Sequence, residues 1–442
     1  MSASENITTQ NIITGQDPAR AARLKKRYAS ERRFKTFGAF AVLVGILFLA
    51  LLFISIFSKG YTAFQQTSIQ LTVLLDEKVI DKKGTRKIKD LGKAIRYSKL
   101  VNRALYQKFD IPLKGRDSKK DRSLAKKIIS GEAGVQLRDM VLNDHGLIGQ
   151  SVTVWLLASG NADSFIKGQI SRDTPEARRQ IKDKQVAWLD MMREEGTLEK
   201  QFNTGLFTFG ASSRPESSGI GAAAVGSLYM MLIVLALALP IGVAASIYLE
   251  EFAPTNRWTD IIEVNINNLA AVPSIVFGLL GLAVFINFAG LPRSASIVGG
   301  LVLTLMTLPT IIIATRSALK AVPQSIRQAA LAVGASKTQS IFHHVLPLAT
   351  PGILTGTIIG LAKALGETAP LLMIGMVAFV KEIPLSPMEP ATALPVQIYM
   401  WSGAAERAFV ERTSAAIIVL LAFLVIMNMS AVILRRRFER RW

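Results

Sequence analysis

The stretch from Ala314 to Leu372 reads ATRSALKAVPQSIRQAALAVGASKTQSIFHHVLPLATPGILTGTIIGLAKALGETAPLL. A short basic segment lies there between two long apolar runs. Pro323 suits the first turn of a helix, and Gly334 suits a break between two helices. Small or apolar side chains share one helical face between these positions: Ile326, Ala329, Ala330 and Val333. The stretch predicts two short helices with a glycine elbow, which form a rigid knob on the inner side of a membrane protein. The alternative is an amphipathic loop lying on lipid headgroups.

The composition of the whole chain indicates a membrane protein. The chain has 442 residues, 50% of them hydrophobic, and a mean hydropathy of +0.34. A membrane-spanning helix needs roughly 20 consecutive apolar residues. Six candidate runs are present, at residues 36–58, 219–249, 266–290, 294–316, 350–378 and 414–434. The first run starts late and no convincing cleavage site follows it, so we expect an uncleaved anchor rather than a signal peptide.

The distribution of charge predicts how these spans are oriented. The tail 1–35 holds eight Lys and Arg residues against three acids, the loop 316–337 holds four against none, and residues 434–442 hold five against one. Loops on the cytoplasmic side of a membrane carry an excess of Lys and Arg. We therefore expect both termini in the cytoplasm and attribute the net charge of +20 to this topology. Membrane lipid is an expected partner, and nucleic acid is not.

The long polar segment 59–218 then lies outside. It holds 29 Lys and Arg residues against 19 acids, and at about 160 residues it is large enough for its own core. Alternating apolar residues predict strands near 69–73 and 151–155. Helices are predicted at 98–109, 119–130 and 174–203, the last with Ile181, Trp188 and Met192 on one stripe. The basic region 78–127 is expected to be a solvated face, although it could instead meet an anionic partner or lipid.

These expectations give a domain plan and a fold class. The plan has a basic cytoplasmic tail at 1–35, a transmembrane helix at 36–58, a periplasmic domain and linker at 59–218, a permease core of five transmembrane helices at 219–434 and a basic C-terminus at 435–442. The fold class is an all-α polytopic membrane protein with six transmembrane helices and an inserted α+β periplasmic domain.

The residue types needed for catalysis are scarce. The chain has no cysteine and three histidines, and the adjacent His343 and His344 point to different faces of a helix, so no metal site is expected. The sequence Gly334-Ala-Ser-Lys337-Thr338 lacks the glycine spacing of a phosphate-binding P-loop. We expect no enzyme activity and no cofactor in this chain, and any ATP hydrolysis to belong to a partner.

Charged residues inside an apolar run mark a candidate pathway. Lys363 and Glu367 lie four residues apart, so a continuous helix would place them on one face, either as a structural pair or as a lining of the translocation path. Gly366 between them would allow another helix or a substrate to approach the backbone closely. Arg316 would either extend to lipid headgroups or offer an anion a forked donor at the inner mouth of a pore.

The loop 317–349 resembles the cytoplasmic loop that importer-type ABC permeases use to dock their ATPase. That loop has the consensus Glu-Ala-Ala, three residues, Gly, nine residues, Ile, one residue, Leu-Pro. Gln328 stands in place of the Glu, and His344 in place of the Ile. The resemblance implies that the following residues couple the chain to an ATPase: Gln328, Ala329, Ala330, Gly334, Leu346 and Pro347.

The core 215–435 resembles the PstA-type permease subunits of bacterial phosphate ABC transporters, with the periplasmic segment as an N-terminal extension. The resemblance is carried by NLAAVPSIVFGLLG at 268–281, TLPTIIIATR at 307–316 and ALGETAPLL at 364–372. Lys363 stands where such permeases are expected to have Arg. The resemblance implies a type I importer fold and a pathway that includes Arg316, Lys363, Gly366, Glu367 and Thr368.

The resemblance also implies an assembly in the bacterial inner membrane. A sister phosphate permease would complete the pore, two copies of the ATPase subunit would bind the two docking loops, and a periplasmic phosphate-binding protein would deliver substrate. The chain would form half of the translocation pore of an ATP-driven phosphate importer. Two alternatives stay open: a permease for another oxyanion or small solute, and a membrane-anchored periplasmic ligand sensor.

Overall fold

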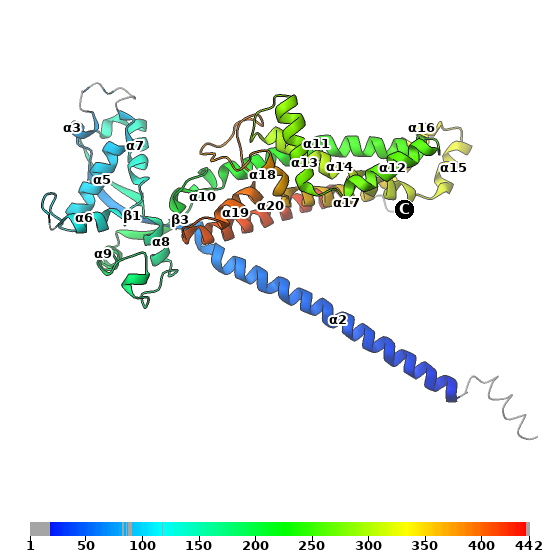
Figure 1. The fold of residues 1–442 in the computed structure, drawn as a ribbon, viewed down its shortest axis with the longest axis horizontal. Coiled ribbons are helices and arrows are strands. Elements are labelled where there is room, and N and C mark those ends of the chain that lie inside the picture. The colour runs from blue at the N-terminus through cyan, green and yellow to red at the C-terminus, as the bar shows by residue number, and fades with distance from the viewer. Residues whose placement is uncertain (1–17, 82–83, 85, 87–90, 117, 439–442) are drawn as a thin grey trace, which may run out of the picture. The chain divides into compact units, whose positions relative to one another are not determined.

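The computed structural model describes residues 18–81, 84, 86, 91–116 and 118–438. Parts of the predicted tail 1–35 and C-terminus 435–442 therefore lie outside the described residues. The chain divides into two units, Met1–Ser58 and Lys59–Trp442. The described part of the first unit is most of helix α2, Pro18–Gly60 (Figure 1). This helix carries basic residues in its first half and apolar residues in its second.

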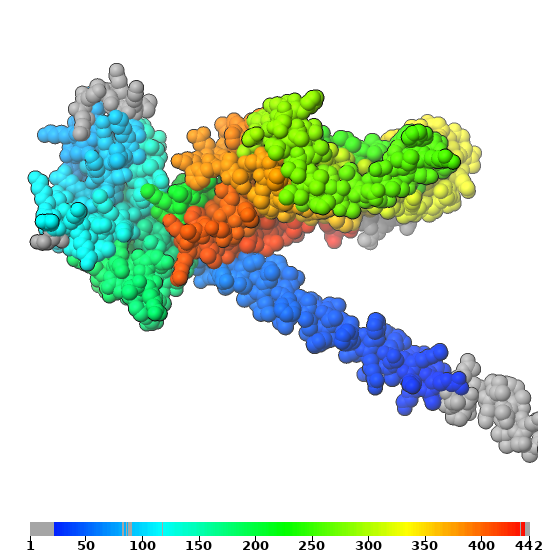
Figure 2. Space-filling model, in the orientation of Figure 1, coloured from blue at the N-terminus to red at the C-terminus, as the bar shows by residue number. Residues whose placement is uncertain are grey.

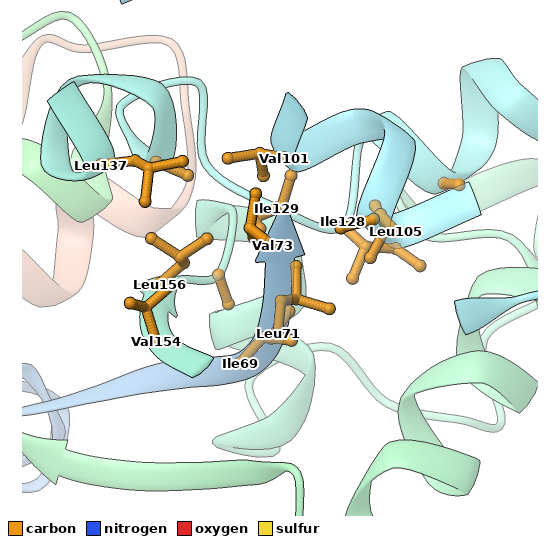
Figure 3. Close-up of a cluster of buried hydrophobic side chains, with 14 of the residues drawn as sticks. Ile69, Leu71, Val73, Val101, Leu105, Ile128, Ile129, Leu137, Val154 and Leu156 are labelled. Atoms are coloured by element: carbon orange, nitrogen blue, oxygen red, sulfur yellow. The ribbon is translucent and has the colours of Figure 1, made fainter. Parts of the chain in front are cut away.

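Residues 59–218, which we call the α+β domain, contain a three-stranded antiparallel sheet. The strand order is β2-β1-β3, and the strands are Gln65–Leu74, Ser151–Leu157 and Leu198–Phe202 in chain order. Alternating residues of the central strand β1 are buried, which confirms the strands predicted near 69–73 and 151–155. Leu71 pairs with Val154 across the β1–β2 ladder, and both enter one apolar core with Leu105 and Leu137 (Figure 3).

Short helices cover this sheet and complete its core. They are α3 Glu77–Ile80, α5 Ala94–Lys108, α6 Ser118–Lys126, α7 Ala133–Asn143, α8 Gly160–Ile166, α9 Asp183–Glu194 and α10 Gly205–Thr208, with 3-10 turns at Tyr61–Phe64, His145–Leu147, Glu176–Arg178 and Pro215–Ser217. Trp188 and Met192 are buried on α9, as predicted, whereas Ile181 is buried in the segment before this helix begins, so the predicted stripe is confirmed only for Trp188 and Met192. The helix predicted over 174–203 is wrong at both ends. It begins only at Asp183, after a 3-10 turn at Glu176–Arg178, and Gly196 takes a φ of +69° and turns the chain into β3.

The remaining helices form an apolar bundle. They are α11 Gly221–Ile247, α12 Arg257–Ala270, α13 Ser274–Gly281, α14 Ser296–Lys320, α15 Gln324–Ala332, α16 Lys337–Ser340, α17 Leu346–Gly366, α18 Ala369–Met373, α19 Leu394–Ser402 and α20 Ala408–Phe438. Single π-helical turns follow α11, α13 and α16, at Tyr248–Phe252, Leu282–Phe288 and Ile341–Val345. Within the described residues, five helices are long and apolar enough to cross a membrane, or up to six if one bent pair counts as a span.

Two of the predicted spans differ from the structure. The run 266–290 is not one straight helix, because α12 and α13 meet at 101° around Pro273, which caps the second helix. The run 350–378 breaks after Gly366, and the short helix α18 begins only at Ala369. Pro370 stands in the first turn of α18, where its missing N–H leaves no hydrogen bond unmade.

Candidate functional site: the 317–349 loop and the adjacent charged residues

The 317–349 loop folds into the two predicted short helices. Pro323 immediately precedes α15, and Ser336 caps α16 by accepting a hydrogen bond from the Gln339 backbone N–H. The Gln339 side chain in turn accepts one from the Ser336 N–H, so the second helix begins with a complete capping box. Figure 2 shows this loop, in yellow, at the surface of the molecule.

Gly334 forms the elbow between these helices. Its φ is +88°, a region that side-chain-bearing residues rarely adopt. A Cβ at this position would meet no atom within 4 Å. Glycine is therefore needed here for the backbone conformation and not for space.

The predicted ATPase-coupling residues lie on both faces of the loop. Ala330 is buried against the bundle, whereas Gln328 and Ala329 are exposed. Leu346 and Pro347 are half-buried at the start of α17. Val333 is 84% exposed because it lies beyond the end of α15, so the predicted apolar face is not buried along its whole length. Exposed Leu331 and Val333 give the loop an apolar surface that a partner protein could cover.

Arg327 anchors α15 to the rest of the bundle. Its Nη2 lies 2.6 Å from Glu251 Oε1, and its guanidinium also donates to the carbonyl oxygens of Val322 at 2.7 Å and Leu319 at 2.9 Å. Glu251 belongs to the π-helical turn that follows α11. One side chain thus joins α15 to the ends of both α11 and α14.

Arg316 has a different role from either of the two expected for it. Its guanidinium is paired with Glu263 of α12 and lies 3.4 Å from Glu250 Oε2, and 14% of its side chain is exposed. The Lys320 Nζ lies 3.6 Å from the same Glu250 oxygen. Arg316 therefore neither extends to lipid headgroups nor stands free for an anion, since its forked donor is occupied by two carboxylates.

The expected ion pair between Lys363 and Glu367 is not formed. α17 ends at Gly366, and Glu367 takes an extended conformation, so the two residues do not share a helix face. Lys363 is exposed and Glu367 is half-buried, and neither makes a salt bridge with any described residue. A Cβ on Gly366 would meet no atom within 4 Å, and Thr368 begins the next turn. The structure thus places four of the predicted pathway residues at the interruption between α17 and α18: Lys363, Gly366, Glu367 and Thr368.

Known proteins resemble the bundle in sequence. The family described as "binding-protein-dependent transport system inner membrane component" matches residues 238–442. The probable ABC transporter permease protein YqgI of Bacillus subtilis is 32% identical over 211 residues, covering 45% of this chain and 71% of the relative. The chain belongs to this ABC permease family. The phosphate transport system permease protein PstA 1 of Mycobacterium tuberculosis is 32% identical over 226 residues, covering 51% of this chain and 73% of the relative.

Other comparisons are less informative. A structure of the MetNI methionine ABC transporter in an inward-facing conformation is 17% identical with a TM-score of 0.40, over 50% of this chain and 95% of that one. Residues 21–176 match a domain of unknown function (DUF3333). The chain is thus a PstA-type ABC permease and a multi-pass protein of the inner membrane, with an N-terminal part for which the matching family describes no function.

Four charged residues of the permease were not predicted from the sequence: Glu250, Glu251, Glu263 and Arg327. Glu251 and Arg327 are 76 positions apart, and a contact of this kind has no local spacing that would reveal it. A signal was nevertheless present. Glu250 and Glu251 come directly after a long apolar run, at the membrane side where the nearby loop carries four basic residues and no acid.

Proposed function

We propose that this permease is one of two membrane subunits of an ATP-driven phosphate importer, and that it forms half of the translocation pore. The observation that carries the proposal is the 32% identity to a phosphate transport permease across 73% of that protein. The bent and broken helices of the bundle suit the role, because a pore that opens alternately to each side needs segments that change angle. The chemistry of ATP hydrolysis belongs to a separate subunit.

The proposed assembly contains a sister permease, two copies of a cytoplasmic ATPase subunit and a periplasmic phosphate-binding protein. The 317–349 loop is the proposed ATPase-coupling element. Its exposed Leu331 and Val333 supply an apolar contact, and Arg327 makes the loop rigid with respect to two long helices. A closure of two ATPase subunits would then move α11 and α14 directly.

The proposed topology places both termini in the cytoplasm and residues 59–218 in the periplasm. The domain boundaries are those expected from the sequence: 1–35, 36–58, 59–218, 219–434 and 435–442. Charge supports this orientation, because the basic 317–349 loop and the basic first half of α2 then lie on one side. The proposed pathway residues are Lys363, Gly366, Glu367 and Thr368, whereas Arg316, whose guanidinium is occupied by Glu250 and Glu263, is not among them.

Uptake by the reconstituted complex tests the function. The permease is assembled in liposomes with its sister permease, ATPase and binding protein, and uptake of radiolabelled phosphate is measured with and without ATP. We expect ATP-dependent uptake that excess sulfate does not inhibit. Uptake of sulfate in place of phosphate would establish the alternative of a permease for another oxyanion, and ATP-independent accumulation would contradict the importer.

A further inference from the structure

A buried lysine joins the α+β domain to the last helix of the bundle. Lys167 caps the C-terminal end of α8, and 1% of its side chain is exposed. Its Nζ lies 2.7 Å from Asp163 Oδ2 on α8 and 3.0 Å from Glu411 Oε1 in the first turn of α20. The other Asp163 oxygen accepts a hydrogen bond from the Thr67 N–H of β1 at 2.9 Å. One ammonium group thus connects the sheet, α8 and α20.

A second buried cation supports the same junction. Arg412, beside Glu411 on α20, donates from Nη2 to Gln66 Oε1 on β1 at 2.5 Å, and each residue is 2% exposed. Gln66 and Thr67 are neighbours on β1, so the first turn of α20 is held by two successive residues of the central strand. Separation of β1 from α20 would remove this hydrogen bond from a charge that is almost fully buried.

An apolar cluster extends the junction, and hydrogen bonds within the α+β domain hold the segments beside it. Glu216, near the end of the domain and before α11, accepts hydrogen bonds from Ser130 Oγ at 2.7 Å and from the Gly160 N–H at 3.0 Å. Asn203 donates to the Ala63 carbonyl at 2.9 Å. Beside these contacts lies an apolar cluster drawn from both parts of the chain: Ala63, Leu206, Ile220, Ala223, Leu394, Trp401, Phe409, Ala415 and Ala416. The domain is therefore joined to the bundle by buried apolar contacts as well as by the ion pair and the hydrogen bond of α20.

The charges at the junction favour a fixed geometry. The Lys167 ammonium lies between the carboxylates of Asp163 and Glu411, the Arg412 guanidinium follows directly on α20, and all four side chains are buried. A buried charge that loses its partner is strongly destabilising, because water does not replace the lost contact. An intermediate state in which the domain swings while the charges stay buried is accordingly unfavourable.

We propose that the α+β domain is a rigid extension of α20, with Lys167 and Arg412 as the positioning residues that clamp it, and that it moves with α20 when the transporter changes state. The movement of α20 rests on the proposed function, but the clamp does not. α20 in turn contacts α17: Arg435 Nη1 of α20 donates to Thr355 Oγ1 of α17 at 3.1 Å. The position of the domain is thereby linked through α20 to the helix that ends at Gly366.

Distance measurements between two spin labels test the clamp. The chain has no cysteine, so cysteines introduced at exposed Lys119 on α6 and Ser402 at the end of α19 are the two labelling sites of this chain. The chain is assembled in lipid nanodiscs with cysteine-free versions of its partners, and the distance distribution is recorded by pulsed electron resonance without nucleotide and with ATP trapped. We expect one narrow distribution with the same mean in both states.

Substitutions identify the residues responsible. Lys167→Met should broaden the distribution, because Asp163 and Glu411 would face each other without a cation between them. Glu411→Gln keeps an oxygen acceptor and the shape of the side chain, so it should fold and broaden the distribution less. Lys108→Met is the matched control, since it breaks an ion pair with Glu195 that lies within the α+β domain and is partly exposed. It should leave the distribution unchanged.

Two results would overturn the proposal: a broad or ATP-dependent distance when Lys167 is intact, or Lys167→Met and Glu411→Gln variants that behave like the Lys108→Met control. Phosphate-stimulated ATP hydrolysis is measured on the same samples. A narrow distance without phosphate stimulation would count against the proposed function and in favour of the clamp. Phosphate stimulation with a broad distance distribution would count in favour of the proposed function and against the clamp.

Discussion

Arg327 of α15 forms a salt bridge with Glu251 in the turn after α11, at the end of the bundle that we propose to be cytoplasmic. Its Nη2 is 2.6 Å from Glu251 Oε1, and the exposed fractions of the two side chains are 14% and 8%. The same guanidinium donates to the carbonyl oxygens of Leu319, in the last turn of α14, and of Val322, in the turn that follows it. A force applied to α15 therefore reaches the turn after α11 through one charged contact and α14 through one hydrogen bond.

Replacing Arg327 by methionine should uncouple the ATPase from transport. The change leaves Glu251 nearly buried without its cation, a loss of about 3–5 kcal/mol for a fully buried pair. We expect lower phosphate uptake per ATP hydrolysed and a lower unfolding temperature. The double variant Arg327→Met with Glu251→Gln should regain much of the unfolding temperature but not the coupling.

Lys320→Met provides the matched control for that experiment. The Lys320 side chain is 60% exposed and lies 3.6 Å from Glu250, so its removal should change stability by less than about 1 kcal/mol. Equal loss of coupling in the Lys320 and Arg327 variants would show that general positive charge, and not the Arg327 contact, is responsible.

Gly334 should tolerate substitution poorly in spite of the open space around it. A residue with a Cβ is strained at a φ of +88°, by roughly 1–2 kcal/mol for a left-handed conformation. Asn adopts this region more readily than other side-chain-bearing residues, so Gly334→Asn should be milder than Gly334→Ala or Gly334→Leu. Copurification of the ATPase with the permease measures the effect.

Gly38→Ala on α2 is the control for the elbow. A Cβ added at Gly38 would also meet no atom within 4 Å, but this residue lies inside a helix, where alanine is favoured by roughly 0.5–1 kcal/mol. This variant should bind the ATPase as the unsubstituted protein does. Normal ATPase binding and uptake by Gly334→Leu would contradict a rigid elbow.

Local patterns in the sequence predicted most elements of the fold. Alternation identified β1 and β2, and proline and glycine located α15 and its elbow, because these signals depend on neighbouring residues. β3 was missed because its sequence, LEKQF, resembles the charged helix before it. Its strand conformation is determined by pairing with β1, as in the Ser68–Glu199 register.

The candidate site was less predictable for a related reason. The spacing of Lys363 and Glu367 implies a shared face only if the helix continues, and Gly366 and Pro370 are signals that it does not. Arg316 appeared free because its partners Glu250 and Glu263 lie 66 and 53 positions away. Tertiary contacts of this range leave no periodicity in the sequence.

Cysteine labelling should locate the α+β domain and the 317–349 loop on opposite sides of the membrane. Lys119→Cys on α6 should react with a membrane-impermeant maleimide in cells whose outer barrier is permeabilised. Gln339→Cys on α16 should react only after the inner membrane is opened. Both positions are exposed, and the chain has no native cysteine to add background. Reversed labelling would invert the proposed topology of every loop.

Lys363 and Glu367 should act independently on assembly and together on transport. Because the two side chains form no ion pair, Lys363→Met and Glu367→Gln should have additive effects on the unfolding temperature, with an interaction energy under about 0.5 kcal/mol. Lys363 is exposed, so its loss should leave the complex assembled, and any fall in phosphate uptake then reflects the pathway rather than folding.

Lys363→Arg keeps the charge and should retain more uptake than Lys363→Met. Full uptake by the double variant would exclude both residues from the pathway, whereas a large interaction energy would show that they pair in a state of the transport cycle other than this one.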